Sequence, residues 1–261
     1  MDLGIKGKTA LVLGASQGIG AGIARALAQE GCNVIVGARR EDVLAELVDE
    51  IKSAHGVEAQ SYAIDMTDKA GVAAMCEKIS GDWQPDILLN NAGGPPGGHI
   101  IGVEDDVWEA ALQSLLMSVI RISEAALEAM IERKWGRILT VTSSGVIQPI
   151  PTIPVSNVVR SGIVSYSKTL SNEVAKHGIT VNTIIPGRID TERTKNMDAF
   201  ASEKQSISVD EVQKRSWAQI PAGRYGSVEE FADVAAFLLS ERASYVTGSQ
   251  IRIDGGTIKN V

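Results

Sequence analysis

The segment Lys8–Gly20 constrains the fold most, because an apolar run there gives way to a glycine-rich turn and then to a helical pattern. Glycines at 14, 18 and 20 let the backbone turn sharply and approach a pyrophosphate, and the first N–H groups of a helix over about 18–30 would face that anion. The spacing, G-x-x-x-G-x-G, also occurs in glycine-rich turns of other kinds. The segment predicts a dinucleotide site made of Gly14, Ser16, Gln17, Gly18, Ile19 and Gly20.

Strand and helix patterns alternate along the rest of the chain, which is typical of a parallel sheet. After the first strand, further strands are expected at 33–37, 59–64, 86–90, 137–142, 179–185 and 248–254. Helices are expected at 41–55, 68–80, 106–134, 154–176 and, behind a capping box at Ser227–Glu230, up to Ser240. We therefore predict an α/β fold that forms one domain over residues 1–261.

Composition limits the choice of partner. A net charge of −7 and a pI near 5.1 argue against a nucleic-acid surface or an anionic membrane, both of which attract clustered Lys and Arg. No apolar run approaches the roughly eighteen residues that a bilayer requires. Cys32 and Cys76 lack C-x-x-C spacing, so we expect reduced core residues in a cytoplasmic protein without a metal site. A small molecule, or a second copy of the chain, is the expected partner.

Arginine follows the second strand, where the ribose of a bound adenosine would lie. An acid there would accept hydrogen bonds from a ribose diol, whereas arginine pairs with a 2′-phosphate. Arg39 and Arg40 occupy this place, so NADP is preferred over NAD; the alternative is a pair of solvated arginines, whose charge would oppose the helix dipole. Asp65, at the end of the third strand, would accept from the adenine amino group or serve as a turn acid or helix cap.

The fourth strand ends in Asn90, Asn91, Ala92 and Gly93. An open parallel sheet places its ligand crevice at the carboxyl ends of its strands, and small residues there admit a cofactor. The following helical pattern, 106–134, is apolar on more than one face. One face should pack on the sheet, and the surplus apolar surface predicts a contact between subunits.

These motifs together resemble the short-chain dehydrogenase/reductase family, and most closely its 3-oxoacyl acyl-carrier-protein reductase type. The resemblance covers nearly the whole chain and is carried by Gly14–Gly20, Asn90–Gly93, Ser143, Gly178–Asn182, Pro186-Gly187 and Asp254–Gly256. It implies a Rossmann-type, doubly wound, seven-stranded parallel sheet in three α/β/α layers, a nicotinamide cofactor and a homotetramer. It also implies that Pro186, Gly187, Ile189 and Thr191 border the nicotinamide amide, and that Asn90 lies on the adenosine side.

The chain departs from the resemblance at the catalytic positions. The family uses Asn, Ser, Tyr and Lys, with Tyr thirteen residues after Ser and Lys four residues after Tyr. Counting from Ser143 leads to Ser156 and Arg160, and counting back from the end of the same helix gives these positions again. The Asn position, seven residues after Trp108, is Leu115. Ser143 alone is retained.

These departures weaken the expected chemistry. A Ser156 hydroxyl would fall about 4 Å short of a tyrosyl oxygen, which leaves room for one water. Water is a much poorer acid than tyrosine, and losing a positioned general acid slows a reaction by about 10²–10⁴-fold. Arg160 stays protonated and would grip the ribose hydroxyls or stabilise an oxyanion. Tyr166 lies about 15 Å further along the helix and is interpreted as a packing residue.

Two hypotheses of different classes follow. The first is an NADP(H)-dependent oxidoreductase for carbonyl/alcohol hydride transfer, 3-oxoacyl reductase-like but slow, acting through Ser143, Arg160 and water or an acidic group of the substrate. The second is a catalytically weak nicotinamide-binding sensor or an inactive subunit of a mixed oligomer. A purely structural protein, the third possibility, would not need glycines at 14, 18 and 20. The polar region 188–218 is either a substrate lid or a solvated helical insertion.

Overall fold

The structure, a computed structural model, describes residues 1–260. Within this range one sheet of seven parallel strands has the order β3-β2-β1-β4-β5-β6-β7. The strands are β1 (Thr9–Leu13), β2 (Asn33–Ala38), β3 (Ala59–Ala63), β4 (Ile87–Asn90), β5 (Gly136–Val141), β6 (Ile179–Pro186) and β7 (Gln250–Ile253). The predicted seven-stranded, doubly wound α/β fold is confirmed. The strand order reverses between β1 and β4, which is where such sheets bind their ligands.

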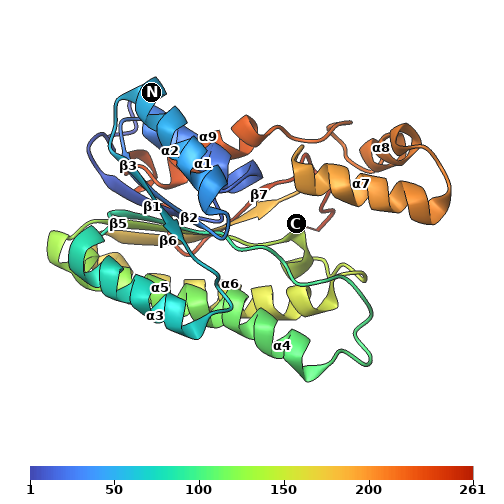
Figure 1. The fold of residues 1–261 in the computed structure, drawn as a ribbon, viewed down its shortest axis with the longest axis horizontal. Coiled ribbons are helices and arrows are strands. Elements are labelled where there is room, and N and C mark those ends of the chain that lie inside the picture. Colours follow the sequence, from blue (N-terminus) through green and yellow to red (C-terminus); the bar gives the residue numbers. More distant parts are fainter. Residues whose placement is uncertain (261) are drawn as a thin grey trace.

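Helices cover both faces of the sheet (Figure 1). One layer holds α1, α2 and α9, and the other holds α3, α4, α5 and α6, so the three-layer arrangement is confirmed. The α-helices are α1 (Gly18–Gln29), α2 (Glu41–His55), α3 (Lys69–Lys78), α4 (Asp105–Ala111), α5 (Ser118–Arg133), α6 (Pro154–Val174), α7 (Glu192–Gln205), α8 (Val209–Trp217) and α9 (Val228–Leu238). Two π-helical turns (Ile79–Trp83 and Leu112–Met117) and three 3-10 turns (Ser144–Val146, Ala175–His177 and Glu241–Ala243) complete the list.

Apolar side chains fill the space between the layers. One cluster packs the α1, α2 and α9 face, and a second packs the α3, α5 and α6 face. Because helices cover both faces, the central strands are apolar throughout, as in Ala10–Leu13 of β1 and Ile87–Leu89 of β4. Within residues 1–260 no helix combines the length and the apolar character needed to cross a membrane.

The helix expected at 106–134 is present but is not regular. It runs as α4, a π-helical turn and α5, and the turn includes Leu115. Such turns are rare and often lie at functional sites. Apolar side chains remain exposed here, with Leu112 at 40% and Met117 at 38%, so the predicted subunit contact stays a prediction.

The C-terminal third contains the segment predicted to be a lid. Residues 188–218 include α7 and α8, which extend beyond the layered body of the molecule (Figure 1). The capping box predicted before the last helix is confirmed, since the Ser227 hydroxyl accepts from the N–H of Glu230 and the Glu230 carboxylate accepts from the N–H of Ser227. Its Glu230 carboxylate also accepts from Arg224.

Candidate functional site

In the glycine-rich turn after β1, positions 14 and 20 have no room for a side chain. Gly14 and Gly18 adopt φ values of +63° and +56°, in the left-handed region that glycine favours. A Cβ on Gly14 would lie 2.5 Å from the main-chain oxygen of Asn91, and one on Gly20 would overlap the Gly14 carbonyl. Gln17, which precedes α1, makes no capping side-chain hydrogen bond. The N–H groups that open α1 are thus left for another acceptor, and this cradle fits a pyrophosphate.

The carboxyl ends of β1, β4 and β6 meet around this turn. Asn91, directly after β4, donates from Nδ2 to the Gly14 carbonyl over 3.2 Å. From the other side, the Cγ2 of Thr191 lies 3.2 Å from the position of a Cβ on Gly18. The structure therefore brings together the predicted residues of three separate segments along one edge of the sheet.

Arginine covers the far end of the turn. Arg40 donates from Nη2 to Gln17 Oε1 over 2.6 Å and to Ser16 Oγ over 3.3 Å. Arg39 and Arg40 are both exposed, so each guanidinium is accessible to a phosphate. A direct link between Arg40 and the turn is a contact that the sequence did not predict.

Asp65 has the contacts of a turn acid. Its Oδ1 accepts from the N–H and the hydroxyl of Thr67 at 2.9 and 2.8 Å. These hydrogen bonds lower the pKa of the Asp65 carboxyl, and the positive charge of Arg39 lowers it further. The turn role that we weighed against adenine recognition accounts for Oδ1, whereas adenine recognition stays a prediction.

The side chain of Asn90 lies in the core, so a place on the adenosine side stays a prediction for its main chain alone. This side chain is 1% exposed, and its Nδ2 donates to Ser123 on α5 over 3.0 Å and to Thr140 on β5 over 3.4 Å. Successive residues of a strand point to opposite faces, so Asn91 turns toward the glycine-rich turn while Asn90 turns into the core. The Asn90 side chain therefore joins β4 to α5 and β5.

The segment after β6 also meets the crevice mainly through its backbone. Gly187 has no room for a side chain, because a Cβ there would lie 2.5 Å from the Cα of Asp254. Ile189 is 4% exposed and packs in the core, so its main chain alone can border a nicotinamide. Thr191 caps α7 with its hydroxyl, which accepts from the N–H of Thr194.

Of the three predicted catalytic residues, Ser143 follows β5, and Ser156 and Arg160 belong to α6. Ser143 follows β5 and is half-buried, and its Oγ accepts from the N–H of Gly145 over 3.2 Å. Ser156, in the first turn of α6, is 5% exposed. Leu115 packs with Val155 and Val159 of α6, so an apolar cluster fills the place expected for an asparagine.

The guanidinium of Arg160 ties two strand ends together. Nη1 donates to the carbonyl of Val141 and Nη2 to that of Ala92, each over 2.9 Å. Burial lowers the pKa of Arg160 to about 10, and the positive charge of Arg193 contributes to the shift. Arg160 therefore remains a cation at neutral pH, and two of its five N–H groups are used.

Arg193 is a site residue that the sequence reasoning missed. It belongs to the first turn of α7, and its Nη2 lies 3.2 Å from the position of a Cβ on Gly94, two residues past Ala92. The available signal was a basic side chain at the N-terminus of a helix, where the dipole disfavours it. The sequence shows the positive charge of Arg193, but it does not show that this side chain lies beside Gly94.

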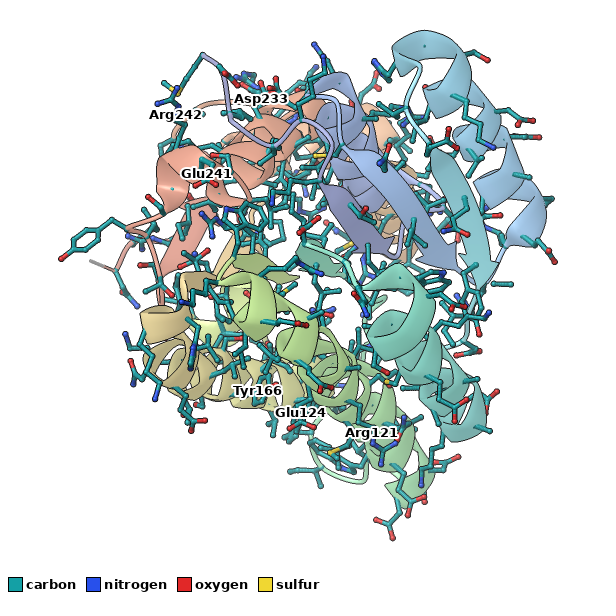
Figure 2. The ribbon with its side chains drawn as sticks, turned by 90° about the vertical axis from the view of Figure 1, so that its left-hand side faces the viewer. Arg121, Glu124, Tyr166, Asp233, Glu241 and Arg242 are labelled. Carbon is teal, nitrogen blue, oxygen red and sulfur yellow. The ribbon has the colours of Figure 1, made fainter. Side chains whose placement is uncertain are left out.

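Tyr166 does not enter the site. It packs against the α3, α5 and α6 cluster, and its hydroxyl lies 3.5 Å from the carbonyl of Ile120. Figure 2 shows Tyr166 and Glu124 within this layer. Burial raises the pKa of Tyr166 to about 12, and the charge of Glu124 contributes. The interpretation of Tyr166 as a packing residue is confirmed.

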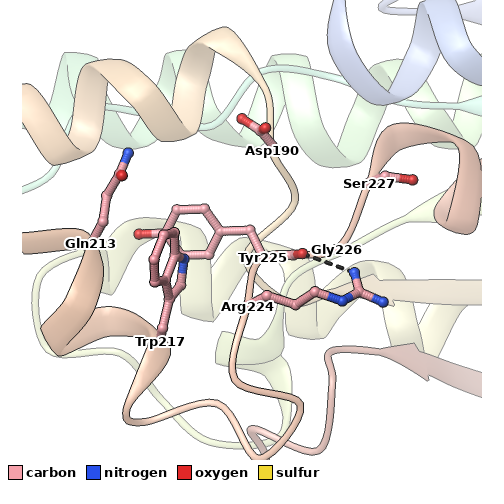
Figure 3. Close-up of a pocket in the computed structure, with 7 residues that line it drawn as sticks. All are labelled: Asp190, Gln213, Trp217, Arg224, Tyr225, Gly226 and Ser227. Carbon is pink, nitrogen blue, oxygen red and sulfur yellow. Dashed lines mark hydrogen bonds between the residues drawn. The ribbon is translucent and has the colours of Figure 1, made fainter. Parts of the chain in front are cut away.

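A separate cavity of about 260 Å³ lies between α8 and the loop before α9 (Figure 3). Its lining consists of Asp190, Gln213, Trp217, Arg224, Tyr225, Gly226 and Ser227. None of these is a predicted site residue. Beside the cavity, the buried carboxylate of Asp198 on α7 accepts from Arg188 over 3.0 Å and from the Tyr225 hydroxyl over 2.9 Å. This network fixes the lid segment to the loop.

Proteins of known families are similar to this chain in sequence. A family model described as enoyl-(acyl carrier protein) reductase matches residues 14–257. The 3-oxoacyl-(acyl-carrier-protein) reductase FabG of Escherichia coli is 35% identical over 97% of this chain and 98% of its own. A putative ketoacyl reductase of Streptomyces coelicolor is 34% identical over 95% and 96%. The chain belongs to the short-chain dehydrogenase/reductase family.

A solved structure matches the whole fold. L-sorbose reductase from Gluconobacter frateurii, complexed with NADPH and L-sorbose, superposes with a TM-score of 0.94. The sequence identity is 34%, and the match covers 100% of both chains. The resemblance inferred from the motifs is therefore confirmed along the full chain.

Proposed function

We propose that the protein is an NADP(H)-dependent oxidoreductase that interconverts a carbonyl and an alcohol on a small molecule, in the manner of a 3-oxoacyl reductase. The observation that carries the proposal is the glycine cradle with Arg40 bonded across it to Ser16 and Gln17. A pyrophosphate on the N–H groups of α1 and a 2′-phosphate beside Arg39 and Arg40 would use this arrangement. The NADPH bound to L-sorbose reductase supports NADP rather than NAD.

The remaining predicted contacts divide between the two ends of the cofactor. Asp65 would meet the adenine, and Asn91, Ala92 and Gly93 would line the ribose side of the crevice. Pro186, Gly187, Ile189 and Thr191 would border the nicotinamide, with Ile189 acting through its main chain because its side chain is buried. The lid of residues 188–218 would close over the substrate.

When bound, NADPH supplies a hydride to a carbonyl carbon. The Ser143 hydroxyl would donate a hydrogen bond to the carbonyl oxygen, and the cation of Arg160 would stabilise the negative charge that develops there. Arg160 would not move the proton, because its pKa of about 10 keeps it charged. Water held beside Ser156, or an acidic group of the substrate, would protonate the oxygen. Since water is a weak acid, we expect turnover about 10²–10⁴-fold below that of an enzyme with tyrosine.

A second function has its own support. Leu115 is packed against α6, and two donors of Arg160 are held by main-chain carbonyls. A nicotinamide-binding sensor, or an inactive subunit of a mixed oligomer, would need the cradle but not a proton donor. In the enzyme, Arg160→Ala should abolish turnover, and an unchanged rate would exclude Arg160 from the mechanism.

The chain is also proposed to form a homo-oligomer. Leu112 and Met117 in the π-helical turn are exposed, and Val158 on α6 is 56% exposed. Burial of such side chains against a second copy would stabilise a dimer or tetramer. Light scattering of the purified protein checks this, and a monomeric mass would contradict it.

Equilibrium binding of NADPH and NADH tests the main proposal. Fluorescence titrations at one salt concentration should give tighter binding of NADPH, and Arg40→Ala should weaken NADPH binding about 10–100-fold with little effect on NADH. Arg39→Ala tests the neighbouring guanidinium, and Arg215→Ala is the matched control, because Arg215 pairs with Glu211 on α8. If the wild-type protein binds neither cofactor, both functions fail.

A further inference from the structure

Two guanidinium groups from different helices meet the same turn. Arg160, on α6, donates to the carbonyl of Ala92 over 2.9 Å. Arg193, on α7, has its Nη2 3.2 Å from the position of a Cβ on Gly94. The turn formed by residues 92–94 follows β4, so both cations lie at the carboxyl edge of the sheet, near the proposed reaction site.

In the described part of the chain, neither guanidinium pairs with a carboxylate. Within residues 1–260 no carboxylate oxygen lies within 4.0 Å of Arg160 or Arg193. The adjacent acid, Glu192, forms an ion pair with Lys195, with 2.8 Å between Oε1 and Nζ. The positive charge of Arg193 helps to lower the pKa of Arg160, which indicates electrostatic repulsion between the two cations. Charges of like sign around a partly buried crevice are unfavourable until an anion compensates them.

Local structure gives no reason for a cation at position 193. The helix begins at Glu192 behind the Thr191 cap, and a basic side chain in this first turn opposes the dipole. Lys195, two residues further along, has Glu192 as its partner, whereas the guanidinium of Arg193 lies beside Gly94 in the segment after β4. Arg160 offers three N–H groups beyond those that hold Ala92 and Val141.

We propose that Arg193, together with Arg160, binds a carboxylate of the substrate, so that the substrate is a ketone or alcohol carrying a carboxylate group. This inference rests on the proposed function and narrows it. The other source of anionic oxygens is the pyrophosphate of the cofactor. The substrate is favoured because Thr191, and not Arg193, is the residue that lies against Gly18 of the cradle. Arg193 instead lies beside Gly94, two residues from the Ala92 carbonyl that accepts from Arg160.

Calorimetric titration with matched acids and esters tests the subsite. Pyruvate, acetoacetate and 4-oxopentanoate, with their methyl esters, are titrated into the full-length protein, both saturated with NADP⁺ and without it. The variants are Arg193→Met and Arg193→Lys. Lys195→Met is the control, because it removes the same charge from the same helix. NADPH affinity is measured in parallel by fluorescence.

At least one acid should bind more tightly than its ester. Arg193→Met should weaken binding of this acid about 10–100-fold, Arg193→Lys should retain most of it, and Lys195→Met should leave it unchanged. NADPH affinity should be the same in all variants. Arg193 is exposed, so its replacement should not impair folding.

The proposal is overturned if none of the acids binds, or if Arg193→Met binds them as the wild type does. Weaker NADPH binding with unchanged acid binding would assign Arg193 to the pyrophosphate and would also overturn it. Failure of the proposed function looks different, because neither NADPH nor NADH would then bind the wild type. The titrations without cofactor would still decide whether the carboxylate subsite exists.

Discussion

Replacing Gly14 with alanine should damage the cradle in two separable ways. Gly14 adopts φ +63°, where a side chain costs about 1–2 kcal/mol. The new Cβ would also lie 2.5 Å from Asn91 O and 2.7 Å from Asn91 Nδ2, compared with about 3.5–4.0 Å for a normal contact. The main chain after β4 must therefore move by about 1 Å, and such overpacking costs a further 1–3 kcal/mol or so.

Gly7→Ala provides the matched control for Gly14→Ala. Gly7 has φ +78°, but a Cβ there would meet nothing within 4 Å, so this variant carries backbone strain alone. Urea unfolding should show a larger loss of stability for Gly14→Ala, and NADPH titration of the folded protein should show affinity reduced by about 10²-fold for that variant only. Equal stability losses together with unchanged NADPH binding by Gly14→Ala would refute the reasoning.

Three further predictions concern catalysis, the core and pH. Ser156→Tyr combined with Arg160→Lys should raise reduction of 3-oxoacyl thioesters by about 10²–10⁴-fold, measured by NADPH absorbance; no gain would show that more than the missing acid limits the site. Arg137→Met should lower the free energy of unfolding in urea by about 3–5 kcal/mol, because the buried guanidinium donates to the carbonyls of residues 136, 178 and 240; a change below about 1 kcal/mol would contradict this. The hydrogen bond from Arg224, together with that from the N–H of Ser227, lowers the pKa of Glu230 from 4.5 to about 2 in the folded state. The stabilisation is therefore present above the unfolded pKa and is lost as pH falls through the folded pKa. Glu230→Gln should weaken the dependence of the unfolding temperature on pH between about pH 5 and pH 2. An unchanged dependence would show that the Arg224–Glu230 pair does not contribute to stability.

The sequence by itself determined the fold and was enough to predict a site at the carboxyl ends of the strands. Apolar periodicity and turn residues are local signals, so α2 was predicted with the bounds observed, Glu41–His55, and the order of all seven strands along the chain was correct. The spacing from Ser143 to Ser156 and Arg160 is equally local, and it predicts serine and arginine where the family has tyrosine and lysine. The capping box at Ser227 belongs to the same class of signal.

Only the tertiary structure decided what the side chains of the site touch. Asn90 and Asn91 are neighbours in sequence, but strand geometry sends the first into the core and the second to Gly14. The partners of Arg160 lie 19 and 68 residues away along the chain. Arg193 meets Gly94 because β4 and β6 end at the same edge of the sheet. Contacts of this kind depend on how distant segments pack, which no local pattern encodes.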